Sequence, residues 1–264
     1  MDNRSIGVFD SGLGGLTAVR EIMKTLPGES IVYFGDTARV PYGTRSEETI
    51  INYVRDDIEL LLKHNVKMIV SACGTASSVA LPVIAKDYDI PVVGVVEPAS
   101  MCAAKASSNG KIGIIGTGGT IKSGKYEKRI KELRSDAEVF AKACPLFVPL
   151  VENGHSDTEV ARLVAEEYLC SLKEEGVDTL VLGCTHYPLL KGVISGIMGT
   201  DTYLVDPGAE TAHYIKELLI QSNSLAEGEG AYKFLVSDSP GDFIRLGGAF
   251  LSRNLDFEVT KVEI

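Results

Sequence analysis

Short apolar segments recur along the chain and predict β-strands. Several are continuous runs of Ile, Val, Leu and Phe, which is typical of parallel strands that are buried on both faces. The predicted strands span residues 6–9, 31–34, 68–71, 92–96, 112–115, 180–182 and 203–205.

Between these segments, apolar residues recur with helical spacing and predict amphipathic helices. The clearest of these helices span residues 17–25, 47–63, 124–133, 158–174 and 209–220. Alternation of strands and helices favours an α/β architecture with mainly parallel sheets.

Two segments of the first half of the chain resemble segments of the second. Residues 6–12 (IGVFDSG) resemble 112–118 (IGIIGTG), an offset of 106 from position 6 to position 112. Residues 69–75 (IVSACGT) resemble 180–185 (LVLGCT), an offset of 111 from Cys73 to Cys184. Apolar strands that end in glycine are common, so one such pair also fits unrelated segments. The shared offset favours a repeat of two similar α/β halves.

The repeat predicts two pseudo-symmetric, doubly wound α/β domains. The first comprises residues 1–96 together with 207–264 and carries Cys73, and the second comprises 97–206 and carries Cys184. Residues 95–98 are the expected hinge between them. The 57 residues after position 207 are too few for an ordinary domain, so we expect them to pack on the first half.

Composition narrows the classes of partner. The chain carries 26 basic and 36 acidic residues, a net charge of −10, which disfavours direct binding of nucleic acid. Trp is absent and aromatic residues make up 7 %, so no platform for stacking bases is indicated. An anionic substrate then has to be held by local donors such as backbone N–H groups and hydroxyls.

The sequence predicts no membrane segment, metal site or cofactor. No apolar run approaches the ~20 residues that span a bilayer, and no secretory signal opens the chain. The five cysteines form no CxxC pair, which favours a cytoplasmic enzyme with free thiols. The glycine-rich segments 10–15 and 116–119 match neither GxGxxG nor a P-loop, and no lysine stands out as a site for pyridoxal phosphate.

Two of the cysteines follow predicted strands and precede helical segments. Ligands of open α/β sheets bind beyond the carboxyl ends of the strands, which is where Cys73 and Cys184 lie. The N-terminus of a helix lowers the pKa of a thiol below its free value of ~8.5, so we expect lowered pKa values for both. The other three cysteines are interpreted as packing residues.

Matched thiols on two similar halves suit a reaction whose substrate and product are mirror images. One thiolate removes the α-proton from one face, and the other thiol delivers a proton to the opposite face. Asp10 is the candidate partner of one thiol and His186 of the other, with Glu152 orienting His186. An alternative interpretation of Asp10 is a turn residue before Gly12.

Three motifs resemble those of glutamate racemases. They are residues 10–16 (DSGLGGL), 35–43 (GDTARVPYG) and 183–190 (GCTHYPLL). The resemblance extends over most of the chain and thins after about residue 228. It implies a two-domain α/β enzyme with a site between the domains and no cofactor, commonly a homodimer, that supplies D-glutamate for bacterial peptidoglycan. Some glutamate racemases also bind DNA gyrase, and the sequence does not decide whether this chain does.

The resemblance also implies roles for individual residues. Those that match Cys73 and Cys184 act as the two bases, and those that match Asp10, Glu152 and His186 assist them. The substrate pocket is expected to be lined by Asp10, Ser11, Pro41, Tyr42, Gly43, Gly74, Thr75, Thr117, Thr185 and His186.

The chain departs from the family pattern beside the first cysteine. The family usually has Cys-Asn-Thr-Ala there, whereas residues 73–76 read CGTA. Losing the hydrogen bond of that Asn to a charged group would cost roughly 1.5–3 kcal/mol, or ten- to a hundred-fold in binding. Two alternatives to glutamate racemisation therefore stay open: a racemase of another small acidic amino acid, or a catalytically weak binding or regulatory homologue.

Overall fold

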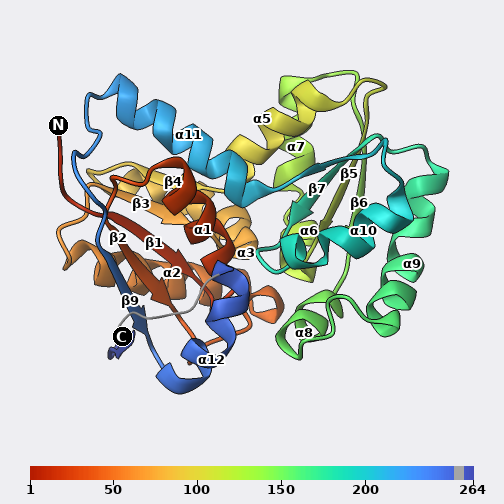
Figure 1. Cartoon of the computed structure of the whole chain (residues 1–264). Coiled ribbons are helices and arrows are strands. Elements are labelled where there is room, and N and C mark those ends of the chain that lie inside the picture. Colours follow the sequence, from red (N-terminus) through yellow and green to blue (C-terminus); the bar gives the residue numbers. More distant parts are fainter. Residues whose placement is uncertain (253–258) are drawn as a thin grey trace.

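Two parallel β-sheets form the framework of the computed structural model, which describes residues 1–252 and 259–264 (Figure 1). The first sheet has the order β10-β9-β2-β1-β3-β4 and the second β6-β5-β7-β8. The strands are β1 (Ile6–Asp10), β2 (Ile31–Gly35), β3 (Met68–Ser71), β4 (Val92–Gly94), β5 (Lys111–Gly116), β6 (Glu138–Ala143), β7 (Thr179–Gly183), β8 (Tyr203–Val205), β9 (Tyr232–Val236) and β10 (Val259–Lys261).

Helices flank both sheets (Figure 1). The α-helices are α1 (Leu16–Thr25), α2 (Glu47–Leu62), α3 (Gly74–Val79), α4 (Leu81–Ile84), α5 (Val96–Ala106), α6 (Gly118–Lys122), α7 (Lys125–Leu133), α8 (Phe147–Glu152), α9 (Glu159–Glu174), α10 (Lys191–Met198), α11 (Pro207–Gln221) and α12 (Pro240–Leu251). Three short 3-10 helices are η1 (Tyr42–Thr44), η2 (Ala85–Asp87) and η3 (Tyr187–Leu190). No helix among the described residues is long and apolar enough to cross a membrane.

The two sheets share one topology. The order β2-β1-β3-β4 in the first sheet corresponds to β6-β5-β7-β8 in the second, and every pair is parallel. Cys73 follows β3 and Cys184 follows the equivalent strand β7. The predicted fold class of two pseudo-symmetric α/β halves with mainly parallel sheets is therefore confirmed.

Several strands depart from the sequence prediction. β6, β9 and β10 were not predicted; β6 is half-buried or exposed throughout and includes Glu138 and Lys142, so it has no continuous apolar run. The strand predicted over residues 92–96 is too long. β4 ends at Gly94, and Val96 begins α5, whose first turn accommodates Pro98 because that position needs no backbone N–H. Residues 95–98, the expected hinge, thus open a helix.

The chain returns to the first sheet after α11. β9 pairs with β2 along five residues, and β10 pairs with β9. The extents of the two predicted domains stay a prediction, and residues 253–258 of the first lie outside the described residues.

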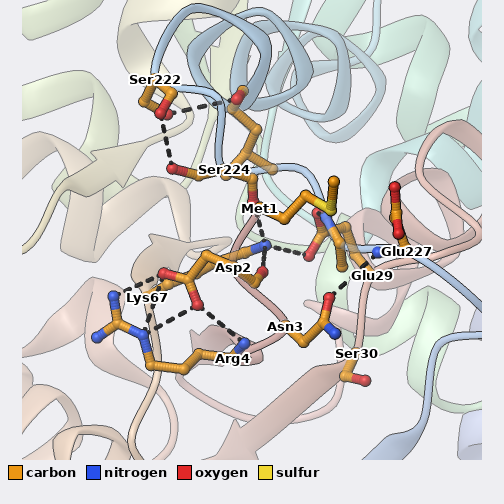
Figure 2. Close-up of polar contacts among 12 residues, drawn as sticks. Met1, Asp2, Asn3, Arg4, Glu29, Ser30, Lys67, Ser222, Ser224 and Glu227 are labelled. Carbon is orange, nitrogen blue, oxygen red and sulfur yellow. Dashed lines mark hydrogen bonds and ion pairs between the residues drawn. The ribbon is translucent and has the colours of Figure 1, made fainter.

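A buried ion pair holds the segment between α11 and β9 (Figure 2). The Lys67 ammonium lies 2.7 Å from Glu29 Oε2 and donates to the carbonyl oxygens of Asp2 and Ser224, also at 2.7 Å. Glu29 Oε1 accepts from the backbone N–H of Ala226 at 2.9 Å. These bonds join the N-terminal segment to the connection that leads into β9.

The two halves are in contact along a boundary that we call the seam. α11 packs against α1 of the first half and α5 of the second (Figure 1). Thr17 on α1 donates its hydroxyl to the carbonyl oxygen of Thr185, which follows β7, at 2.9 Å. The carboxyl ends of β3 and β7 also meet, because Gly74 at the start of α3 touches the backbone of Gly183. Loops from both sheets thus converge at one place.

Candidate functional site

The seam brings the two predicted thiols to one site. The residues next to them, Gly74 and Gly183, are in contact across the seam. Cys73 is 5 % exposed and Cys184 is 9 % exposed. The negative charge that either sulfur would carry acts on the buried hydroxyl of Tyr126. Two buried thiols from equivalent strands of opposite halves therefore share one enclosed environment.

Cys73 lies among groups that keep it protonated. Its sulfur accepts from the backbone N–H of Ala76 at 3.4 Å and donates to Ser11 Oγ at 3.7 Å. Burial raises the pKa of Cys73 to about 12, and the nearby carboxylate of Asp10 adds to the rise. The expected lowering of this pKa is wrong, because one hydrogen bond at the start of a six-residue helix does not offset the loss of hydration.

Asp10 ends β1 and is 1 % exposed. Its Oδ2 accepts from the backbone N–H of Gly12 at 3.1 Å, which is the turn contact of the alternative interpretation. Its Oδ1 is buried and has no hydrogen-bond partner among the described residues. Burial raises the pKa of Asp10 above its ordinary value. An unpaired carboxyl oxygen close to a thiol is a group that can exchange a proton or accept a hydrogen bond during a reaction.

Cys184 has a cationic partner instead. The Nδ1 of His186 lies 3.9 Å from the Cys184 sulfur, and its Nε2 lies 3.0 Å from Oε1 of Glu152. Burial alone would lower the pKa of His186, but hydrogen bonds to Cys184 and Glu152 outweigh it and raise the pKa to about 10. The imidazole is then protonated near neutral pH and places a positive charge beside the Cys184 sulfur. The α-helix after this thiol begins only at Lys191, so the imidazolium takes the place of the expected helix N-terminus.

Hydroxyl groups line the seam beside the thiols. The Oγ1 atoms of Thr75 and Thr117 share a hydrogen bond of 2.9 Å across the two halves, and Thr117 also contacts Thr120 at 3.0 Å. Thr185 Oγ1 lies 3.4 Å from Nδ1 of His186. Gly43 packs directly against Thr117. Thr120 was not among the predicted lining residues, and only the helical spacing from Thr117 signals it.

The side chains of two predicted lining residues, Tyr42 and Pro41, do not point to the thiols with a polar group. The hydroxyl of Tyr42 points to the buried carboxyls of Asp36 and Asp57 rather than to the thiols. Pro41 is exposed and follows a cis peptide bond. These residues can contribute to a pocket through their backbone, whereas Ser11, Thr75, Thr117 and Thr185 bring hydroxyls to it.

Gly74 occupies a position where a side chain does not fit. A Cβ at residue 74 would fall well inside contact distance of the Gly183 carbonyl oxygen. The carbonyl is backbone at the end of a central strand, so it cannot rotate away. Gly74 therefore permits the close approach of α3 to β7, and an Asn at this position would require a wider seam.

Comparisons with known proteins agree with this arrangement. A family model described as Asp/Glu/Hydantoin racemase matches residues 6–215. A glutamate racemase of Geobacter metallireducens is 50 % identical over 254 residues, covering 96 % of this chain and 94 % of the relative. The crystal structure of glutamate racemase isoform RacE1 from Bacillus anthracis has a TM-score of 0.96 and 38 % identity, over 100 % of this chain and 99 % of that one.

A further solved structure contains a ligand. Glutamate racemase from Francisella tularensis, in complex with D-glutamate, has a TM-score of 0.92 and is 36 % identical. The alignment covers 100 % of this chain and 98 % of that chain. The similarity therefore extends over both halves and over the seam.

Proposed function

Because this chain belongs to the glutamate racemase family, and is thus an isomerase, we propose that it interconverts L- and D-glutamate with Cys73 and Cys184 as the two bases. The observation that carries this proposal is the pair of buried thiols, one from each half, with opposite electrostatic partners. A carboxyl group lies beside Cys73 and an imidazolium beside Cys184.

The proposed reaction needs one thiolate and one thiol at a time. The thiolate sulfur takes the proton from Cα, and the electron pair of that C–H bond stays on the substrate as a carbanion. The thiol on the opposite face then gives its proton to Cα, which completes the inversion and leaves the second sulfur as the thiolate. No cofactor enters this balance.

The surroundings of the two thiols set the starting state. The His186 imidazolium lies beside Cys184, while burial and Asp10 favour the protonated thiol at Cys73. We therefore propose that Cys73 is the protonated thiol in the resting enzyme. Glu152 holds the imidazole in position through its bond to Nε2.

Local donors are proposed to hold the two carboxylates of the substrate. The chain has a net charge of −10, so its overall field does not attract an anion. The hydroxyls of Ser11, Thr75, Thr117 and Thr185 lie at the seam and can donate to carboxylate oxygens. Backbone N–H groups of Tyr42, Gly43 and Gly74 complete the proposed pocket.

Single thiol substitutions test the two-base mechanism. We expect Cys73→Ser and Cys184→Ser each to lower racemisation by about 10²- to 10⁴-fold, because a serine hydroxyl is a far weaker acid. Each variant should still exchange the α-proton of one enantiomer with deuterated buffer. Proton NMR measures both quantities in reducing buffer.

The matched control is Cys170→Ser, which changes an exposed cysteine on α9 and should leave the rate unchanged. A wild-type racemisation rate in Cys73→Ser or in Cys184→Ser would rule out the two-base mechanism. A panel of L-amino acids in the same deuterated buffer decides between glutamate and another small acidic amino acid, and no exchange of any of them would favour the binding homologue.

The biological setting is proposed from the same family membership. We propose that the enzyme supplies D-glutamate for peptidoglycan in the cytoplasm and forms a homodimer. Growth of a deletion strain only when D-glutamate is added would support the first point, and light scattering measures the second. Gyrase binding stays an open alternative that a pull-down with purified gyrase tests.

A further inference from the structure

A buried pair of carboxyl groups lies behind the loop at 41–43, outside the site of the thiols. Asp36 follows β2, and Asp57 belongs to α2. The side chains of both are 0 % exposed. The hydroxyl oxygen of Tyr42 lies 2.5 Å from Asp36 Oδ2 and 2.9 Å from Asp57 Oδ2. One phenol thus bridges two acids in the interior.

The number of protons in this bridge is fixed by its geometry. A tyrosine hydroxyl has one proton and can donate to only one of the two carboxyls. A proton on the other acid would let that acid donate to the Tyr42 oxygen and so satisfy the second short contact. Two ionised carboxylates against one buried phenol would leave one pair of oxygens in repulsion. The geometry of the bridge therefore favours a neutral state for one of the two acids.

The remaining contacts identify the neutral acid as Asp57. Asp36 accepts from Arg39 Nε at 2.5 Å and from Ser237 Oγ at 2.8 Å, in addition to Tyr42. Among the described residues, Asp57 accepts one further bond, from a terminal nitrogen of Arg39 at 2.9 Å. Burial and the charge of Asp36 raise the pKa of Asp57 well above its ordinary value. Asp56 faces the same guanidinium, so Arg39 already balances two anions.

The bridge connects to the proposed pocket through the main chain. Tyr42 begins η1, and the next residue, Gly43, packs against Thr117 and Gly119 of the second half. Thr117 in turn shares its hydroxyl hydrogen bond with Thr75. A shift of the Tyr42 side chain would therefore move the loop that closes against these hydroxyls.

We propose that Asp57 acts as a neutral acid that positions the loop at 41–43 for substrate binding, by donating a hydrogen bond to Tyr42. This role rests on the proposed function, because the loop is taken to be a wall of the glutamate pocket. Asp57 touches no proposed reacting atom, so it is a positioning residue. Its loss should weaken substrate binding more than it slows proton transfer.

Two substitutions at residue 57 separate the neutral acid from an anion. Asp57→Asn keeps a donor toward Tyr42 and an acceptor toward Arg39, so its KM should stay within about two-fold of the wild type. Asp57→Leu removes both, and we expect KM for glutamate to rise roughly ten-fold or more with a smaller change in kcat. Tyr42→Phe should resemble Asp57→Leu, and the double variant should be no worse than either single one.

An infrared measurement reports the proton directly. The difference spectrum between the wild type and Asp57→Asn should contain the carbonyl stretch of a protonated carboxylic acid at neutral pH. This readout does not depend on activity. A wild-type protein that fails to exchange glutamate would contradict the proposed function while leaving the infrared result in force.

Three outcomes would overturn the positioning role. They are a KM for Asp57→Asn raised as much as that for Asp57→Leu, a wild-type KM in Asp57→Leu, and an infrared spectrum with only carboxylate bands. If Asp57→Leu does not fold, as judged by circular dichroism, Tyr42→Phe and Asp57→Asn decide. A raised KM in Tyr42→Phe together with a wild-type KM in Asp57→Asn supports the proposal. Equal KM values in these two variants contradict it.

Discussion

At the scale of single residues, Gly74 has two consequences for the site. Gly74 lacks the side-chain amide of the Asn that glutamate racemases usually have beside the first cysteine. It also allows α3 to approach Gly183 more closely than any residue with a Cβ would permit. The absence of a side-chain amide at this position is thereby coupled to the close approach of α3 and Gly183.

We expect Gly74→Ala to lower kcat/KM for glutamate by about ten- to a hundred-fold, because the added Cβ forces the seam open at an estimated 1–3 kcal/mol. Steady-state kinetics measures this effect. Gly196→Ala is the matched control, since nothing lies within 4 Å of a Cβ at that exposed helical glycine. An unchanged kcat/KM in Gly74→Ala would contradict the close approach. A lower KM in Gly74→Asn would show that the missing amide affects binding more than the width of the seam does.

At the scale of elements, the connection from α11 to β9 depends on one buried ion pair. The side chains of Lys67 and Glu29 are 2 % and 1 % exposed, and Lys67 also serves two backbone carbonyls. The Lys67 ammonium thus links the N-terminal segment and the returning chain to the first sheet (Figure 2). The pair stabilises the joining of these elements, and it lies away from the thiols.

We expect Lys67→Met to lower the free energy of unfolding by about 3–5 kcal/mol, because it leaves the Glu29 carboxylate buried without its cation. Urea unfolding followed by circular dichroism measures this change. Lys261→Met is the control: Lys261 and Asp238 form an exposed pair, for which a loss of at most ~1 kcal/mol is expected. Equal losses in the two variants would show that burial of the first pair has no special effect.

At the scale of the whole molecule, His186 lies where the two halves meet, and its protonation is linked to folding. The ring of His186 packs edge-on against Phe250 of α12, with centroids 5.3 Å apart, and its pKa rises from 6.5 to about 10 in the folded protein. A raised folded-state pKa means that the native state holds this proton more tightly than the unfolded chain does. Its contribution to stability is complete below pH 6.5 and is lost as the pH rises toward about 10.

Stability of the wild type should therefore fall between about pH 6.5 and 10. In His186→Asn this part of the pH dependence should be absent. Urea midpoints measured across that interval in both proteins provide the comparison. Parallel curves would contradict the raised pKa of His186. The rise for Cys73 from 9.0 to about 12 acts mostly above this interval and is common to both proteins.

The sequence by itself determined the central framework and the positions of Cys73 and Cys184 behind equivalent strands. Continuous apolar runs predict β1, β2, β3, β5 and β7, because strands buried on both faces need apolar side chains at every position. Equivalent glycine and cysteine positions behind those strands predict the repeat. The edge strand β6 escaped prediction because its exposed positions admit polar residues, and the inner strand β9 escaped because Lys233 interrupts its short apolar run.

Only the tertiary structure decided the electrostatics of the site. Cys73 and Cys184 have similar neighbours in sequence, yet burial beside Asp10 raises the pKa of the first, while the His186–Glu152 pair puts a cation beside the second. The bridge from Asp57 to Tyr42 and the contact of Gly74 with Gly183 likewise join residues far apart in the chain. Burial and charge depend on what lies nearby in space, and a sequence pattern records only what lies nearby along the chain.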